Sequence, residues 1–218
     1  MPGKSYRGSV PVMTQDEAIL RDALYCDVAT LAGEIGERNL FRYDALAAAA
    51  GFLEATLRAA GYVVRRQGYE VGGRICHNIE AEIAGTDRAG EVVIVGGHYD
   101  SVVGSPGAND NATGVAAVLA LARAFAGKRT SRTLRFLGFV NEEPPWFRTP
   151  AMGSLRYARR CGEGGERVAA MLSLETIGYY ADEKGSQRYP FPLSSFYPST
   201  GNFIAFVGNM ASRRLVRA

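Results

Sequence analysis

Residues 91–101 have the sequence Glu-Val-Val-Ile-Val-Gly-Gly-His-Tyr-Asp-Ser, which is the most informative stretch for the fold class. Its uninterrupted apolar run, from Val92 to Val95, is typical of a central strand buried on both faces. Two glycines follow, and then His98 and Asp100. In open α/β sheets, ligands bind beyond the carboxyl ends of the strands. The stretch therefore predicts a buried strand that delivers polar side chains to a functional edge.

The apolar periodicity on either side of this strand alternates between helix and strand. The pattern predicts helices over residues 20–35, 43–60, 112–125 and 152–160, and strands over residues 62–66, 75–83, 92–95, 134–140, 169–174 and 203–207. Thr14 and Glu17 have the spacing of a capping box in front of the first helix. This alternation predicts an α/β fold of three αβα layers around a mixed, mostly parallel sheet, with its early strands paired as an antiparallel hairpin.

We expect residues 1–218 to form a single domain, with N-terminal helices in 1–61 and the chemically active core in 62–178. The segment 179–202 is long and rich in aromatic residues, and loops of that length are uncommon unless they are functional or disordered. It is interpreted either as the rim of a substrate pocket or as surface packing. The last residues, 213–218, resemble the opening of a helix, so we expect the domain's final strands to be missing from this chain.

The composition narrows the functional classes. Apolar residues make up 47% of the chain and charged residues 22%, which is the ordinary balance of a soluble globular protein. The net charge is +3 with scattered basic residues, which argues against nucleic-acid binding. An odd number of cysteines, the absence of a signal-peptide pattern and the absence of an apolar run of about 18 residues favour a cytoplasmic protein with no membrane partner. The sequence indicates no oligomeric state.

Potential metal ligands follow the first buried strand. His98 is followed by Asp100 and, before the next helix, by Asp110. Imidazole and carboxylate together suit a divalent ion such as zinc. We expect Asp100 to support a ligand rather than to bind the metal itself: it would accept the ring N–H of His98 and so fix the tautomer of that ring. For Asp110 alone, a plain helix N-cap is the structural alternative.

Carboxylates also fall at the ends of two later strands. Glu142 and Glu143 follow the strand at residues 134–140, and Glu175 follows the strand at 169–174. Adjacent buried carboxylates repel each other unless a cation relieves them, and one of the pair can then remain free as a general base. The coincidence of three strand ends predicts a metal site.

These motifs together resemble the family of zinc aminopeptidases with paired metal ions, which includes bacterial leucyl aminopeptidases and is related to glutaminyl cyclases and glutamate carboxypeptidases. The resemblance covers about residues 78–178 and rests on His-Tyr-Asp-Ser at 98–101, Gly-Ala-Asn-Asp-Asn-Ala-Thr-Gly at 107–114, Asn-Glu-Glu at 141–143 and Gly-Ser-x-x-Tyr-Ala at 153–158. It implies a zinc-exopeptidase fold and a peptide substrate.

The resemblance also implies the role of each site residue. His98 and Glu175 would bind one zinc ion, Glu143 would bind a second, and Asp110 would bridge the two. Glu142 would be the general base that takes a proton from a zinc-bridged water. The peptide bond after the bridging aspartate is expected to be cis.

The sequence departs from the family pattern in three respects. Glu175 stands where many relatives have aspartate, and residues 144–150 form a longer, proline-rich segment in which Trp146 is a candidate wall of a specificity pocket or a packing residue. The downstream histidine that normally completes the second metal site is missing. His77 lies too early in the chain and is interpreted as structural. We therefore expect two zinc ions in a complete site, but one or none in this chain.

The leading functional hypothesis is a metallo-aminopeptidase that hydrolyses N-terminal peptide bonds, with Glu142 and Asp100 as its catalytic pair and with His98, Asp110, Glu143 and Glu175 as metal ligands. A glutaminyl cyclase-like or carboxypeptidase-like relative is the first alternative. A catalytically impaired or non-catalytic peptidase-like domain is the second.

Overall fold

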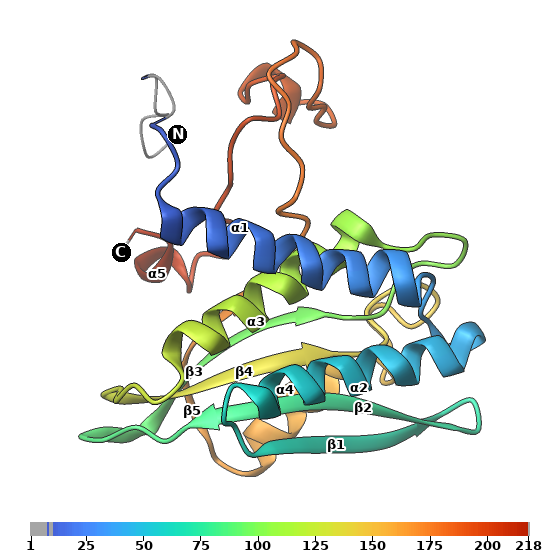
Figure 1. Ribbon diagram of the computed structural model, residues 1–218, viewed down its shortest axis with the longest axis vertical. Helices are drawn as coiled ribbons and strands as arrows, with labels where there is room; N and C mark the ends of the chain where they lie inside the picture. The colour runs from blue at the N-terminus through green and yellow to red at the C-terminus, as the bar shows by residue number, and fades with distance from the viewer. Residues whose placement is uncertain (1–7, 9–10, 218) are drawn as a thin grey trace.

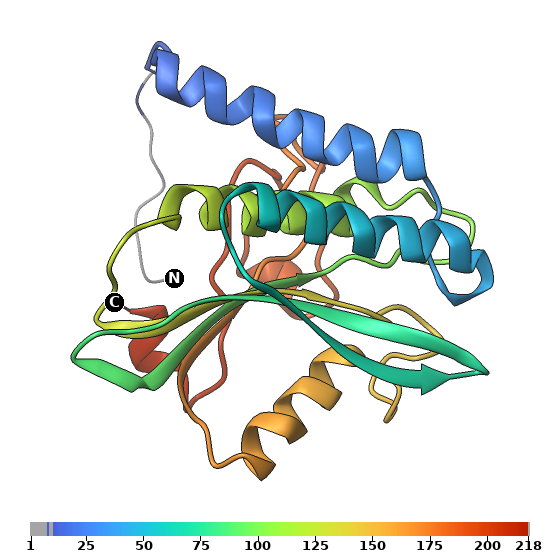
Figure 2. The same ribbon diagram turned by 60° about the horizontal axis from the view of Figure 1, so that its bottom comes forward.

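The computed structural model describes residue 8 and residues 11–217 of the chain. The helices are α1 (Gln15–Val28), α2 (Tyr43–Ala59), α3 (Thr113–Phe125), α4 (Gly153–Glu163) and α5 (Arg213–Val216), and the strands are β1 (Val64–Val71), β2 (Arg74–Ile83), β3 (Arg88–His98), β4 (Arg132–Phe139) and β5 (Arg167–Ser173). Figures 1 and 2 show α1, α2 and α3 on one side of the sheet and α4 on the other. The three-layer prediction is confirmed.

The capping box predicted in front of the first helix is present, but the α-helix that it starts ends at Val28, and the predicted remainder to residue 35 is a π-helix, Ala29–Ile35. The hydroxyl of Thr14 accepts a hydrogen bond from the backbone of Glu17, whose carboxylate accepts one from the backbone of Thr14, so both capping bonds are present. Helix α2 is closed by Gly61, which has a φ of 94°. No helix among residues 11–217 has both the length and the apolar character needed to cross a membrane.

The sheet is mixed and has the strand order β1-β2-β4-β3-β5. Strands β1 and β2 form the predicted antiparallel hairpin, whose turn residues Gly72 and Gly73 both have a positive φ. Strand β2 also runs antiparallel to β4, whereas β3 runs parallel to β4 and to β5. Parallel and antiparallel neighbours are thus equally frequent among the described strands. The carboxyl ends of β3, β4 and β5 lie together at one edge.

The main core lies between the sheet and helices α2 and α3. Leu53, Leu119 and Phe136 are buried there. Helix α2 approaches so closely that a Cβ atom at Gly138 would lie 2.3 Å from Leu53 Cδ2. A smaller cluster packs against α4 on the other face. Two packed faces explain why β3 and β4 are apolar at successive positions.

The predicted strand at residues 203–207 is wrong. The structure assigns no strand there, and Ile204, Phe206 and Val207 are largely exposed. An apolar run becomes a strand only when a neighbouring strand completes its backbone hydrogen bonds. Within the described part of the chain, β5 pairs only with β3, and no strand lies beside residues 203–207.

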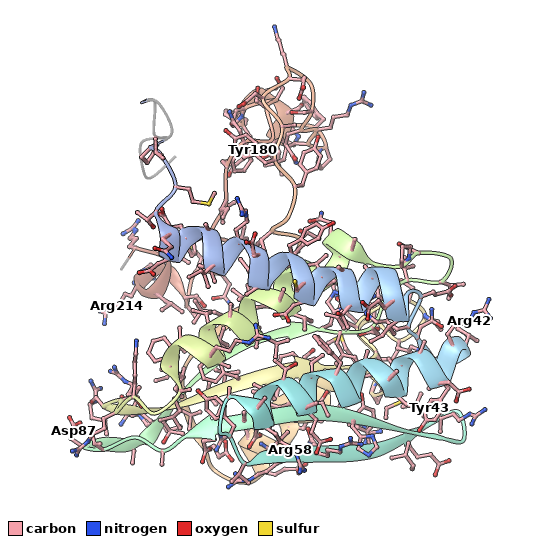
Figure 3. All side chains as sticks on the ribbon, viewed as in Figure 1. Arg42, Tyr43, Arg58, Asp87, Tyr180 and Arg214 are labelled. Carbon is pink, nitrogen blue, oxygen red and sulfur yellow. The ribbon has the colours of Figure 1, made fainter. Side chains whose placement is uncertain are left out.

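The aromatic segment 179–202 projects away from the sheet (Figure 1). Its only regular element is a short 3₁₀ turn at Leu193–Ser195. Backbone bonds such as Ala181 N–H to Gly201 O, at 3.0 Å, close its base. Tyr180, labelled in Figure 3, is 65% exposed, so surface packing does not account for this ring.

Candidate metal centre

Five candidate ligand or base residues converge at the carboxyl edge of the parallel strands. His98 is the last residue of β3, and Glu142 and Glu143 follow the end of β4. Glu175 lies two residues beyond β5, and Asp110 lies just before α3. The strand order places β3 between β4 and β5, so the histidine is central to the cluster.

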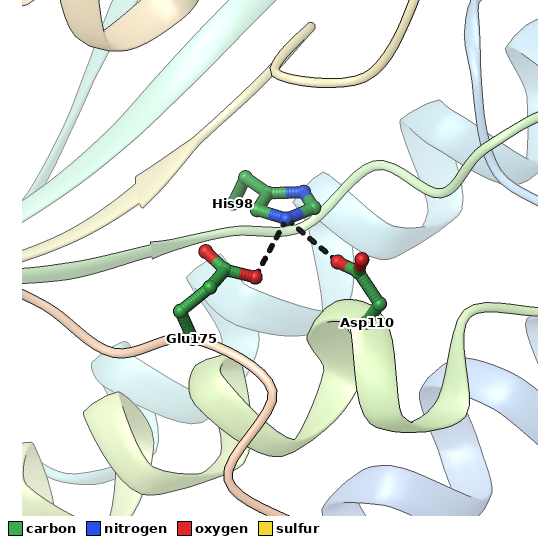
Figure 4. A group of neighbouring side chains, drawn as sticks. All are labelled: His98, Asp110 and Glu175. Carbon is green, nitrogen blue, oxygen red and sulfur yellow. Dashed lines mark hydrogen bonds and ion pairs between the residues drawn. The ribbon is translucent and has the colours of Figure 1, made fainter. Parts of the chain in front are cut away.

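One group of potential ligands consists of His98, Asp110 and Glu175 (Figure 4). The imidazole Nε2 atom of His98 lies 3.1 Å from Asp110 Oδ1 and 3.3 Å from Glu175 Oε1. The imidazole is buried, whereas the two carboxylates are about half exposed. This arrangement can hold an ion at the surface of the sheet edge, with the histidine behind it. The predicted cis peptide bond between Asp110 and Asn111 is present.

A second group consists of His98, Glu142 and Glu143. Glu142 Oε2 lies 3.8 Å from the same His98 Nε2 atom. A single imidazole nitrogen binds one ion at a time, so the two groups cannot both use it. A bridging position for Asp110 remains a prediction, because the second group does not include it.

Asp100 joins the ends of two strands. Its carboxylate accepts backbone N–H groups from Glu142, at 3.2 Å, and from Glu143, at 3.1 Å. The Nδ1 atom of His98 lies 3.2 Å from the backbone carbonyl oxygen of Asp100 and 3.5 Å from its carboxylate. Asp100 therefore lies against the ring, with its backbone carbonyl nearer than its carboxylate, and it also binds the backbone of both glutamates; its role in fixing the tautomer stays a prediction.

Asn111 is a functional candidate that the sequence reasoning missed. Its side chain is completely buried and donates to Leu174 O at 2.9 Å and to the Glu175 carboxylate at 3.3 Å. Its amide oxygen accepts backbone N–H groups from Gly114 and Thr176. Asn111 thus ties the start of α3 to the loop that carries Glu175. Its position next to Asp110, at the start of a predicted helix, was the one feature of the sequence that could have pointed to Asn111.

The pKa values of the cluster indicate a concentration of negative charge that a bound cation would stabilise. Burial opposes protonation of His98, but the carboxylates of Asp100, Asp110 and Glu175, which accept hydrogen bonds from the protonated ring, raise the pKa of His98 to about 12. Burial and the neighbouring Asp110 raise the pKa of Glu143 to about 7, and burial also raises the pKa of Glu142. In the metal-free chain, the imidazole of His98 offsets part of this negative charge.

The donor set fits a divalent ion. The Oε1 atom of Glu143 is buried and has no hydrogen-bond partner among the described residues. A buried carboxylate oxygen left without a partner is costly, and a bound cation would remove that cost. One imidazole nitrogen with several carboxylate oxygens is a donor set that zinc accepts.

A cavity of about 690 Å³ opens beside the cluster. His98, Glu142 and Glu175 line one part of it, and most of the remaining wall is apolar, including Ile94, Phe139, Phe147, Met152, Val168 and Met171. The proline-rich segment contributes Phe147, whereas Trp146 packs against the core. None of residues 179–202 lines this cavity, so the rim interpretation of that segment gains no support from it.

His77 lies outside both ligand groups, as the structural interpretation predicts. Its backbone carbonyl accepts a hydrogen bond from Tyr99 Oη at 2.8 Å. Burial and the nearby Arg66 lower the pKa of His77. Its ring contributes to a separate small cavity of about 100 Å³ between β2 and α2.

Three known proteins illustrate what the chain is similar to. The uncharacterized protein YfbL of Escherichia coli K12 is 36% identical over 200 residues, which cover 87% of this chain and 60% of YfbL. The zinc aminopeptidase BSAP of Bacillus subtilis superposes with a TM-score of 0.65 at 16% identity, covering 76% of this chain and 71% of BSAP. A glutaminyl cyclase of Porphyromonas gingivalis superposes with a TM-score of 0.58 at 21% identity, covering 76% and 64%.

The sequence match and the structural matches differ in what they establish. At 16% and 21% identity, the superpositions show a shared α/β fold. The chain spans about 60% of the length of YfbL. The model of peptidase family M28 matches residues 78–209, which is more than half of the chain and includes every candidate ligand. The chain belongs to peptidase family M28.

Proposed function

We propose that this chain carries the catalytic centre of a zinc-dependent exopeptidase that releases residues from the N-termini of peptides. The proposal rests on the convergence of His98, Asp110 and Glu175 beside Glu142 at the mouth of an apolar cavity. Membership of a peptidase family and a fold shared with a solved zinc aminopeptidase support it.

His98, Asp110 and Glu175 would hold the zinc ion. Zinc, when bound in such a site, polarises a carbonyl group and makes water a stronger acid. Glu142 would accept the proton from the attacking water on its carboxylate and return it to the departing amine. Asp100 would keep Glu142 in place through the backbone bond at 3.2 Å, and the apolar cavity would receive a substrate side chain.

The test uses the full chain loaded with zinc and two substrates, an aminoacyl anilide and a peptide with N-terminal glutamine. We expect release of the aniline, and we expect Glu142→Gln to lower turnover by about 10²–10⁴-fold, the usual contribution of a general base. Zinc affinity should stay within about threefold, because the amide keeps the shape of Glu142. Undiminished turnover in Glu142→Gln would reject Glu142 as the base.

Glutaminyl cyclisation is the second candidate, and the shared fold with a solved glutaminyl cyclase favours it. In that reaction, the N-terminal amine attacks its own side-chain amide and ammonia leaves. Ammonia release from the glutaminyl peptide without aniline release would select the cyclase. Zinc binding without either product would indicate a metal-binding domain that is not catalytic by itself.

A further inference from the structure

Arg38 is a completely buried arginine in the segment between α1 and α2. Its guanidinium donates hydrogen bonds to five backbone carbonyl oxygens, those of Leu31, Gly36, Tyr99, Pro106 and Gly107. None of these partners is a side chain. An arginine bonded in this way fixes the path of the backbone around it.

The carbonyl groups bound by Arg38 flank the metal centre. Tyr99 directly follows His98, and its oxygen lies 2.6 Å from Arg38 Nε. Gly107 precedes Asp110 by three positions, and its oxygen lies 3.0 Å from an Arg38 terminal nitrogen. The loop between the two ligands is therefore held at both ends by the same side chain.

The backbone of Arg38 binds the same loop. Its N–H donates to Ser101 Oγ at 3.1 Å, and its carbonyl accepts the Ser101 N–H at 2.8 Å. The Ser101 hydroxyl in turn donates to Ser105 O at 2.8 Å. A Cβ atom at Gly107 would lie 2.5 Å from Asp110 O, 2.6 Å from Ser101 Cβ and 3.3 Å from an Arg38 nitrogen, so the loop is closely packed against Arg38.

The chemistry of the site is specific for arginine. A guanidinium directs five N–H donors in one plane, whereas a lysine ammonium has three donors at a single point and is more strongly hydrated. Burial lowers the pKa of Arg38 to about 10, against the influence of Asp100, so the group stays charged at neutral pH. Retaining a buried cation here stabilises one arrangement of the carbonyl groups over others.

We propose that Arg38 is a positioning residue that sets the separation of His98 and Asp110 and thereby the zinc affinity of the centre. This inference rests on the proposed metal function. Residues that orient ligands without touching the metal typically change its affinity by 10- to 100-fold when they are replaced. We expect Arg38→Lys to weaken zinc binding about tenfold or more.

Arg123→Lys is the matched control. Arg123 is more exposed than Arg38, and it binds the carboxylate of Asp27 through two of its nitrogens, at 2.6 and 2.9 Å, which links α3 to α1. It lies at the end of α3 remote from Asp110, roughly 15–20 Å away along the helix axis at about 1.5 Å per residue. Its replacement should lower the melting temperature and leave zinc affinity within about twofold.

The measurement is competition with a chromophoric chelator at pH 7.5, using the full chain and variants whose circular dichroism matches it. Weak binding in Arg38→Lys with unchanged affinity in Arg123→Lys supports the proposal. Equal affinity in Arg38→Lys and the unaltered chain overturns it. Failure of the unaltered chain to bind zinc would instead reject the metal centre, and this proposal with it.

Should Arg38→Lys not fold, Ser101→Ala applies the same test from the loop side. This change removes the oxygen that accepts the Arg38 N–H and binds Ser105. A several-fold loss of zinc affinity supports the proposal, and an unchanged affinity overturns it. Hydrogen exchange of backbone amides offers a second readout. The N–H of residue 101 should exchange faster in either variant, while the amides of α3 should keep their exchange rates.

Discussion

At the scale of single residues, the centre depends on side chains that hold the candidate ligands as much as on the ligands themselves. Asn111 donates to Leu174 O and to Glu175, while Asp100 accepts from the backbone of Glu142. These supporting contacts involve main-chain atoms of loops that are far apart in sequence. We therefore expect conservative substitutions at these supporting residues to disturb the centre.

Asn111→Asp should destabilise the metal-free chain by about 1–3 kcal/mol. A carboxylate of the same shape cannot donate to Leu174 O, and it would face the carboxylate of Glu175. Urea unfolding in the presence of a chelator measures the loss.

Asn109→Asp is the control for this substitution. Asn109 Oδ1 accepts the Gly178 N–H at 3.0 Å, and an aspartate oxygen can accept the same bond. Its stability should change by about 0.5 kcal/mol or less. A loss in Asn111→Asp no larger than that of the control would contradict the role assigned to Asn111.

The sequence identifies the ligands more readily than their supports. His98, Asp110, Glu142 and Glu175 are recognisable because charged residues at strand ends are a local signal. Arg38 lies in Gly-Glu-Arg-Asn, residues 36–39, which resembles any charged turn. Its burial arises only once a loop more than 60 residues later folds over it, and no local pattern contains that information.

At the scale of elements, α4 is attached to the sheet by a buried charge network. Glu80 on β2 accepts hydrogen bonds from Tyr157 at 2.8 Å and from Arg160 at 2.6 Å, both on α4. Burial tends to raise the pKa of Glu80, but the hydrogen bonds from Arg160 and Tyr157 outweigh it and lower the pKa below its usual 4.5. The ionised form is therefore favoured in the folded chain.

This network predicts an acid-sensitive contribution to stability. Because the folded pKa of Glu80 is lowered, its contribution is complete above pH 4.5 and is lost as pH falls through the folded value. Glu80→Gln should cost about 1.5–3 kcal/mol at pH 7, and the difference from the unaltered chain should shrink below pH 4.5.

Urea unfolding between pH 3 and pH 7 checks the prediction for Glu80. Glu163→Gln, an exposed position at the end of α4, is the control and should leave the pH dependence unchanged. A difference between Glu80→Gln and the unaltered chain that is independent of pH would contradict the assignment.

The strand predictions were correct where the structure provides a neighbouring strand. The buried strands β3 and β4 have neighbours on both sides, and the apolar runs at residues 92–95 and 134–140 correspond to them. The run at 203–207 is equally apolar, but no strand lies beside it in the described part of the chain. Strand propensity reflects packing against neighbours, so it could not distinguish the two cases.

At the scale of the whole molecule, the shared imidazole limits the metal content. Both ligand groups require His98, so we expect one zinc ion per chain to bind tightly. Zinc at about 100 times its dissociation constant should stabilise the chain by about 2.7 kcal/mol.

Calorimetric titration gives the stoichiometry, and melting with and without zinc gives the stabilisation. Asp110→Ala should abolish the zinc-dependent rise in melting temperature, because it removes a ligand that contributes no core packing. Two ions of equal affinity, or an unchanged rise in Asp110→Ala, would contradict this arrangement of ligands.

The strand order explains why ligands so far apart in sequence meet. β3 lies between β4 and β5 in parallel register, so the segments that follow these strands emerge side by side. The alternation of helix and strand predicts parallel neighbours in general, but it does not specify their order. That order was obtained only from the structure, and it decides that His98 lies between Glu142 and Glu175.

The two hydrogen bonds that the Asp100 carboxylate accepts from the backbone N–H groups of Glu142 and Glu143 have a kinetic consequence. They fix the segment after β4 to the segment after β3, so we expect this part of the site to be arranged before a metal ion binds. Metal uptake should then proceed at a rate set by diffusion and by shedding of hydration water, with one exponential phase in stopped-flow traces. Replacing Asp100 by alanine would leave β3 and β4 paired but would release the segment of Glu142 and Glu143, so we expect a slower phase as that segment reorders beside the bound ion.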